Sequence, residues 1–412
     1  METQASYRTI SPQGIIGILL AAILSTSSCI LLPTFTGRPV DPGDRRAPFN
    51  DGYRDFKGVI HCHSKYSHDS DGSKEEIIQA ARKTGMRFLI MTDHPSSKAI
   101  PYGIKGWRKG VLFLVGAELS QGGWGMLALD IHQHIPEDQP TQPLVEEIQR
   151  QGGLAFVGHM EDVKSWRFQG YDGLEIYNVH ANLSDGNRFL MTLKGLLLPP
   201  HLFYALSVSR PSENLARWDR LARERRVVGI AGNDAHANVK LLFGVAGTVG
   251  TYEQVFKIVS THVLARELNR ESLKEALRQG HSYISMDVFG DGTGFQFLAR
   301  DGRQQVIMGD EIEWSPRLEL NVYSPGRGKI KLFRSGQLVR QVKGYLLDYL
   351  VPEPGVYRAE VYRRGKFWLC SNPIYVRQPS TNGSPPQAVL ETHTAPPVTS
   401  PSLPGSYRNF LF

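Results

Sequence analysis

Two short motifs early in the chain place histidines directly after apolar runs. The first is His61-Cys62-His63, and because side chains alternate between the faces of a strand, we expect both imidazoles on one face and Cys62 on the other. The second ends at His94, after residues 87–92, which read as a strand with an apolar centre. One histidine at a strand end is usually solvated or hydrogen-bonded, but two such ends in succession indicate the first part of a metal site, since imidazole is a common metal ligand.

The segment between these motifs supplies carboxylates and a helix. Asp69 lies in the loop that leaves the first strand, and His68 and Asp71 are alternative ligands from the same loop. Ser73 and Glu76 have the spacing of a capping box, which predicts the start of a helix. Strand, helix and strand in this order are typical of an α/β fold, whose sites form at the carboxyl ends of the strands.

The motifs resemble those of the PHP family, named after polymerase and histidinol phosphatase. Its members begin with H-x-H, an acidic loop and T-D-H, which correspond here to the histidines at 61 and 63, to Asp69 and to His94. The resemblance covers roughly residues 55–285. It implies an α/β fold, a distorted (β/α)7 barrel.

Three later segments resemble further motifs of the family, in the family's order. Glu118 follows an apolar strand in a G-x-E motif, which in PHP proteins bridges two metals. His159 ends G-G-L-A-F-V-G-H, similar to the family's G-G-hydrophobic-A-H. Asp234 and His236 lie in G-N-D-A-H, which closely resembles the closing motif G-S-D-A-H.

The resemblance implies two or three divalent metal ions, with zinc, manganese or iron favoured because mixed imidazole and carboxylate ligation suits these cations. The implied ligands are His61, His63, Glu118 and Asp234 for the first ion, Glu118 and His159 for the second, and Asp69, His94 and His236 for the third. Asp234, His236 and Glu118 are also the expected catalytic residues.

The chain departs from the family pattern shortly after Glu118. Many members have a histidine there, whereas this chain has Gly123 and Trp124. His132 or His134 could substitute for it, although surface-loop histidines are the favoured interpretation of both. Glu175 is expected to orient a ligand histidine from behind.

The function implied by the resemblance is metal-dependent hydrolysis, with a phosphoesterase favoured. We expect small phosphate esters, nucleotides or short oligonucleotides as substrates and a metal-activated hydroxide as the nucleophile. No G-x-S-x-G motif supplies a serine nucleophile.

Two alternatives remain. A carboxylic or carbamate ester hydrolase is suggested by the segment S-N-P-I-Y-V at 371–376, which resembles the tail of a secreted PHP branch related to carbaryl hydrolases. A non-catalytic, surface-anchored binding module that contains metal is the alternative from another class, supported by the residue change at Trp124.

Composition and patterning predict more than one folded part. The 412 residues carry a net charge of +7, which suits an anionic partner, yet the charges are scattered, so nucleic acid is possible but not indicated. We expect a linker at 36–54, the PHP barrel at 55–285, a small antiparallel β-sandwich domain at 286–377 and a disordered Pro/Ser/Thr-rich tail at 378–412. An arginine-rich helix at 212–226 is expected to present a solvated face.

Residues 1–35 have the pattern of a signal peptide or membrane anchor. An apolar run at 15–24 is followed by small residues up to Cys29, which also resembles a lipoprotein signal. We therefore expect an exported or membrane-anchored protein, with the membrane as a partner if this segment is kept or lipidated. The three cysteines are far apart and predict no essential disulfide.

Overall fold

The computed structural model describes residues 48–184, 197–236, 250–302 and 304–379. The expected signal or anchor at 1–35, most of the linker 36–54 and nearly all of the tail 378–412 lie outside these ranges. Within them, no helix is both long enough and apolar enough to cross a membrane.

Parallel strands carry the first two histidine motifs. β1 (Arg54–Ile60) pairs with β2 (Phe88–Met91), which pairs with β4 (Val111–Val115), all in parallel. The crossover between β1 and β2 is α2 (Lys74–Lys83), and both hydrogen bonds of the predicted capping box at Ser73 and Glu76 are present. Every residue of β2 and β4 is buried, as expected for strands covered on both faces.

A second sheet of five strands carries the later motifs. Its order is β5 (Ala117–Ser120), β6 (Gly125–Leu129), β7 (Leu154–Gly158), β8 (Gly173–Asn178) and β9 (Val228–Gly232). The pairs β5–β6 and β6–β7 are antiparallel, whereas β7–β8 and β8–β9 are parallel. The antiparallel hairpins interrupt the regular alternation of parallel strands and helices that an ideal barrel requires.

The two sheets meet at both margins. On one side the Asn233 amide donates to the Ile60 carbonyl at 2.9 Å, and Cys62 forms a parallel bridge with Ala235. On the other side the Ile131 amide donates to the Val115 carbonyl at 3.1 Å. The predicted α/β class is therefore confirmed, but the strands are arranged as two sheets that contact each other rather than as one continuously paired barrel.

The remaining elements surround these strands. The helices are α3 (Ala99–Tyr102), α4 (Thr141–Arg150), α5 (Val179–Ser184), α7 (Pro200–Ser207), α8 (Ser212–Glu224), α9 (Tyr252–Val255), α10 (Arg270–Gln279) and the 3-10 turn η3 (Asp287–Phe289). The other strands are β3 (Gly106–Arg108), β10 (Ser260–Ala265), β11 (Ser282–Ser285), β12 (Gln296–Arg300), β13 (Gln305–Ile307), β14 (Glu311–Glu313), β15 (Glu319–Arg334), β16 (Gln337–Leu350), β17 (Gly355–Arg363), β18 (Lys366–Ser371) and β19 (Ile374–Arg377).

The carboxyl-terminal strands continue the first sheet. β10 pairs with β1, β11 pairs with β10, and β18 pairs with β11, all antiparallel, so hydrogen bonding runs from the first strand into the carboxyl-terminal part. The described residues from 48 onward form one compact unit. At the boundary expected at 285 the sequence changes from the pattern of alternating strands and helices to that of short strands, but the sheet continues across it.

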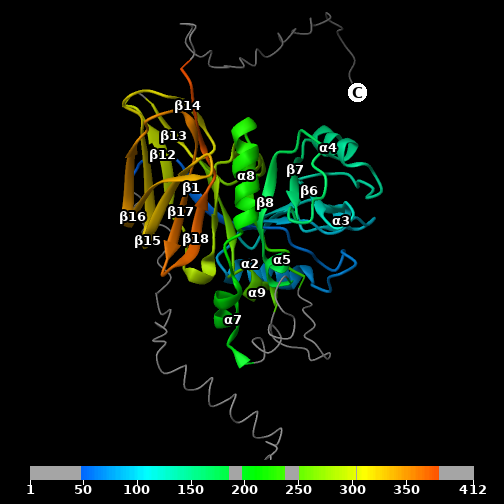
Figure 1. The fold of residues 1–412 in the computed structure, drawn as a ribbon. Coiled ribbons are helices and arrows are strands. Elements are labelled where there is room, and N and C mark those ends of the chain that lie inside the picture. Colours follow the sequence, from blue (N-terminus) through cyan, green and yellow to red (C-terminus); the bar gives the residue numbers. More distant parts are fainter. Residues whose placement is uncertain (1–47, 185–196, 237–249, 303, 380–412) are drawn as a thin grey trace, which may run out of the picture. The chain divides into compact units, whose positions relative to one another are not determined.

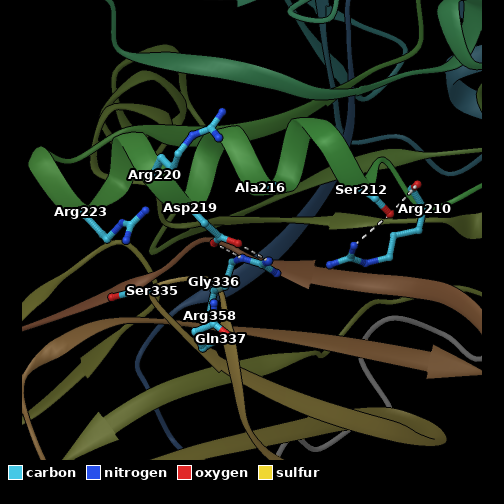
Figure 2. Close-up of a pocket in the computed structure, with 10 residues that line it drawn as sticks. All are labelled: Arg210, Ser212, Ala216, Asp219, Arg220, Arg223, Ser335, Gly336, Gln337 and Arg358. Atoms are coloured by element: carbon cyan, nitrogen blue, oxygen red, sulfur yellow. Dashed lines mark hydrogen bonds and ion pairs between the residues drawn. The ribbon is translucent and has the colours of Figure 1, made fainter.

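Helix α8 packs against β17 through buried ion pairs. Figure 2 shows Arg358 pointing toward Asp219, and its Nε and Nη2 lie 2.6 and 2.8 Å from the two carboxylate oxygens. Glu360, fully buried, accepts from Arg358 and from Arg210. Arg217 donates to the Met160 carbonyl, so the basic side of this helix is less solvated than the sequence predicts.

Candidate metal centre

The predicted site residues follow the ends of successive strands, as the sequence indicates. His61 and His63 follow β1, His94 follows β2, Glu118 lies within β5, and His159 follows β7. Asp234 and His236 follow β9, and Asp69 comes from the loop before α2. The structure brings these eight side chains together, linked by the distances below.

Four of them form the most buried group, with ligand atoms all within 4.8 Å of one another. Glu118 Oε2 lies 3.0 Å from His61 Nε2 and 3.2 Å from His63 Nε2, and Asp234 Oδ1 lies 3.3 Å from the same two nitrogens. Four ligands bound tetrahedrally at about 2.0 to 2.1 Å would be separated by about 3.3 Å, so the spacing fits one divalent ion.

Two orphaned atoms in this group support the same conclusion. His63 Nε2 and Asp234 Oδ1 are buried and have no hydrogen-bond partner among the described residues. Leaving buried polar atoms unpaired costs about 1 to 3 kcal/mol each, so such atoms usually have a ligand as their partner. The donor set therefore fits a bound cation.

The other four residues extend the cluster on both sides. His159 Nε2 lies 3.3 Å from Glu118 Oε1 and 3.4 Å from Asp234 Oδ2. On the opposite side Asp69 Oδ2 lies 3.0 Å from His236 Nε2 and 3.2 Å from His94 Nε2. Glu118 and Asp234 thus lie between the imidazoles of several motifs, as residues shared by neighbouring ions would.

Backbone conformation explains how these side chains converge. His61, His159 and Asp234 have φ angles of 67°, 46° and 47°, in the left-handed region that residues other than glycine seldom adopt. The strand alternation proposed for the first motif is therefore wrong, because β1 ends at Ile60 and a left-handed turn directs His61 inward. The expectation that both imidazoles lie together still holds, since the rings of His61 and His63 are 5.1 Å apart. Unusual backbone of this kind is concentrated at functional sites.

Glu175 has the supporting role that the sequence suggests. It is 1% exposed, and its Oε1 lies 2.6 Å from His61 Nδ1. Its Oε2 accepts from the His159 backbone amide and from the Asn178 side chain, both at 3.0 Å. A Cβ at Gly232 would lie 1.6 Å from Glu175 Oε1, so only glycine fits beside this carboxylate.

The charges of the cluster are strongly coupled. Burial disfavours the imidazolium form of His63 and His159, but the carboxylates of Asp234 and Glu118 outweigh it and raise the pKa to about 9 for His63 and to about 11 for His159. Burial likewise opposes ionisation of Glu118 and Asp234, yet the charge of His61 helps to lower the pKa of both well below their usual range. The buried carboxylates are therefore stabilised by nearby positive charge, which either protons on the imidazoles or metal ions can supply.

One residue near the cluster was missed by sequence reasoning. His180 Nδ1, on α5, lies 3.4 Å from Asp234 Oδ2, and its ring is 5.6 Å from that of His236. It comes two residues after β8, so the rule that placed the other histidines at strand ends could have found it.

The alternatives left open by the sequence separate in the structure. A cavity of about 260 Å³ opens at the cluster, and Trp124 and His180 line it, whereas His132 and His134 do not. Both of these histidines are exposed. His68 remains an alternative, since it groups with Asp69 and His94 at ligand distances.

Comparison with known proteins agrees with the resemblance seen in the sequence. The model of the PHP domain matches residues 60–292, more than half of the chain. No curated protein matches. Among solved structures, a two-domain protein of Bacteroides vulgatus ATCC 8482, which contains a predicted PHP-like metal-dependent phosphoesterase, is 13% identical. The match covers 80% of this chain and 97% of that one, with a TM-score of 0.40. On the family match, this chain belongs to the PHP domain family.

Proposed function

We propose that this protein is a metal-dependent phosphoesterase that hydrolyses small phosphate esters, such as nucleotides or short oligonucleotides. The observation that carries the proposal is the convergence of eight side chains beside an open cavity, with five histidines and one aspartate gathered around Glu118 and Asp234. Such a density of metal-binding groups exceeds what a single structural ion needs.

The residues at the site divide into three roles. His61, His63, Glu118 and Asp234 would hold one ion, His159 and Glu118 would contribute to a second, and Asp69, His94 and His236 would hold a third. Zinc, manganese or iron suits this donor set. Bound ions would activate water near neutral pH and neutralise charge on the substrate's oxygens.

The protein's own groups fix the geometry and move the proton. Glu175 holds His61 through its Nδ1, which leaves Nε2 directed at the cluster. His236 and His180 both lie at the cavity and are more exposed than His61 and His63. Because His236 would hold an ion, His180 is the one placed to protonate a leaving group. Asp234, between these imidazoles, orients them toward the cavity.

The wider organisation is part of the same proposal. The two sheets act as a distorted barrel that supports the site, and residues 286–377 form a β-sandwich domain attached to it. Export or membrane anchoring through residues 1–35 would place the activity outside the cytoplasm.

Turnover of aryl phosphates, mononucleotides and aryl esters, each with Mn²⁺ or Zn²⁺, tests the proposal. We expect phosphate esters to be hydrolysed and the activity to be lost when His61 and His63 are both replaced by alanine. Faster turnover of carboxylic or carbamate esters would favour the alternative suggested by residues 371–376. Fewer than two tightly bound ions per purified chain, with no turnover of any ester, would favour the non-catalytic binding module.

A further inference from the structure

Strand β16 forms a long edge of the sheet in the carboxyl-terminal part. It has 14 residues, and among the described residues its only partner is β15 (Figure 1). Its other side presents backbone N–H and C=O groups, which can pair with a further strand. Edge strands are usually short or interrupted by proline, whereas this strand is more than twice the usual length of about 5 to 6 residues.

Exposed apolar side chains are concentrated on this strand. Leu338, Tyr345, Leu346 and Leu350 are 44–59% exposed, and they make up four of the eight large hydrophobic side chains that are exposed in the described ranges. One strand thus carries half of them. Such a concentration is typical of a surface that another molecule covers.

The sequence of β16 is complementary to itself in one antiparallel register. With Gly344 opposite Gly344 of a second copy, Arg340 lies opposite Asp348, and Val342 lies opposite Leu346. Opposite charges and apolar pairs directly across two strands both stabilise a sheet. The two-fold symmetry produces each of these pairs twice.

Neighbouring registers lack this match. An axis one residue earlier places Lys343 opposite Lys343, and an axis one residue later places Arg340 opposite Leu350. If the two-fold axis fell between two residues, a residue that points its N–H and C=O groups at the partner strand would face one that points them away. The ladder of hydrogen bonds would then be broken. Only the Gly344 register combines paired charges with a complete ladder.

We propose that two copies of this chain associate through β16, forming one continuous antiparallel sheet with Gly344 on the two-fold axis. A Cβ at Gly344 would meet no atom within 4 Å, so the position tolerates a side chain. Asp348 accepts a hydrogen bond at one carboxylate oxygen from the Asn321 amide of β15 at 2.5 Å, and the residue is exposed, so its other oxygen can accept from Arg340 of the second copy. The association leaves the metal cluster untouched, because none of the cluster residues lies on β16.

Cysteine cross-linking in the full-length chain tests the register. Directly opposed Cα atoms of an antiparallel pair are about 4.5 to 5.5 Å apart, within the range that a disulfide spans. Under mild oxidation we expect Gly344→Cys to give a covalent dimer on non-reducing electrophoresis. The matched variant Gln341→Cys should give no covalent dimer, because its two introduced cysteines would be about 20 Å apart in the associated pair. The wild-type chain, treated in the same way, controls for cross-links formed by its native cysteines.

Charge reversal tests the proposed ion pairs between Arg340 of one copy and Asp348 of the other. Arg340→Asp in the Gly344→Cys background should lower the yield of cross-linked dimer about tenfold, since both charge pairs become repulsive. Adding Asp348→Arg to the same chain should restore the yield. Equal cross-linking at 341 and 344, no dimer with Gly344→Cys, or a yield insensitive to Arg340→Asp would each overturn the proposal. Circular dichroism of every variant establishes that it is folded.

Discussion

Replacing Glu175 with glutamine removes a carboxylate while keeping the shape of the side chain. In the structure one oxygen faces His61 Nδ1 at 2.6 Å, and the other accepts from the His159 amide and the Asn178 side chain at 3.0 Å. A glutamine has one oxygen and one NH₂ group, so in either orientation a donor faces a donor. The substitution therefore disturbs the support of two predicted metal ligands at once.

The expected effect is on metal affinity more than on folding. Loss of such a supporting hydrogen bond typically weakens metal binding 10- to 100-fold, or about 1.4 to 2.7 kcal/mol. The assay is the number of ions that the chain retains against graded concentrations of chelator, with unfolding of the metal-free chain measured in parallel. We expect Glu175→Gln to lose its ions at about 10- to 100-fold lower chelator concentration.

Glu360→Gln is the matched control for this prediction. Glu360 is also fully buried and accepts from two arginines, but it lies in β17, outside the cluster. Its replacement should lower the free energy of unfolding and leave chelator resistance unchanged. If Glu175→Gln holds its ions as tightly as the wild-type chain, Glu175 has no part in positioning His61.

Two further predictions concern the stability of the fold. Asp219→Ala should lower the free energy of unfolding by roughly 3 to 5 kcal/mol, because it leaves the guanidinium of Arg358, 2% exposed, without its bidentate partner; urea unfolding measures the loss. Asp291→Asn tests pH dependence: burial opposes ionisation, but Lys57, His262 and Thr293 lower the pKa of the carboxyl to about 2. Because the folded-state pKa is depressed, the stabilisation is present above about pH 4 and is lost as the pH falls toward 2. The asparagine variant should therefore be less stable than wild type by roughly 2 kcal/mol at pH 7, with the difference closing between pH 4 and 2, and equal differences at both ends would contradict it.

The site residues could be proposed from the sequence because the ends of strands can be located in it. Apolar runs such as 111–115 locate the strands, and the polar residue that follows each run must lie at the same edge of a parallel arrangement. This reasoning predicts that Glu118 and His159 lie near each other, and in the structure His159 Nε2 is 3.3 Å from Glu118 Oε1. The rule was not applied after β8, where it would have found His180, and it also pointed to His132 and His134 after β6, which do not line the cavity.

The local geometry could not be predicted in the same way. A φ of 67° at His61 leaves no trace in the sequence, since nothing but the surrounding structure holds a histidine in that conformation. Long-range pairing is equally hidden. Ser285 pairs with Leu369, and no local pattern connects residues so far apart, so the sequence did not predict that strands on both sides of residue 285 share one hydrogen-bonded sheet.

The segment around Trp124, where the chain departs from the family pattern, packs closely beside Glu118 and the cavity. A Cβ at Gly125 would lie 2.3 Å from Glu118 Oε1, so the strand beside the shared carboxylate must approach without a side chain. Trp124 stacks on Phe168, with ring centroids 5.4 Å apart, and forms part of the cavity wall. The β5–β6 turn thus supplies an aromatic side chain at the position where the family pattern has an imidazole. His180, from α5, lines the same cavity and lies 3.4 Å from Asp234 Oδ2, so a further imidazole reaches the cluster from another element.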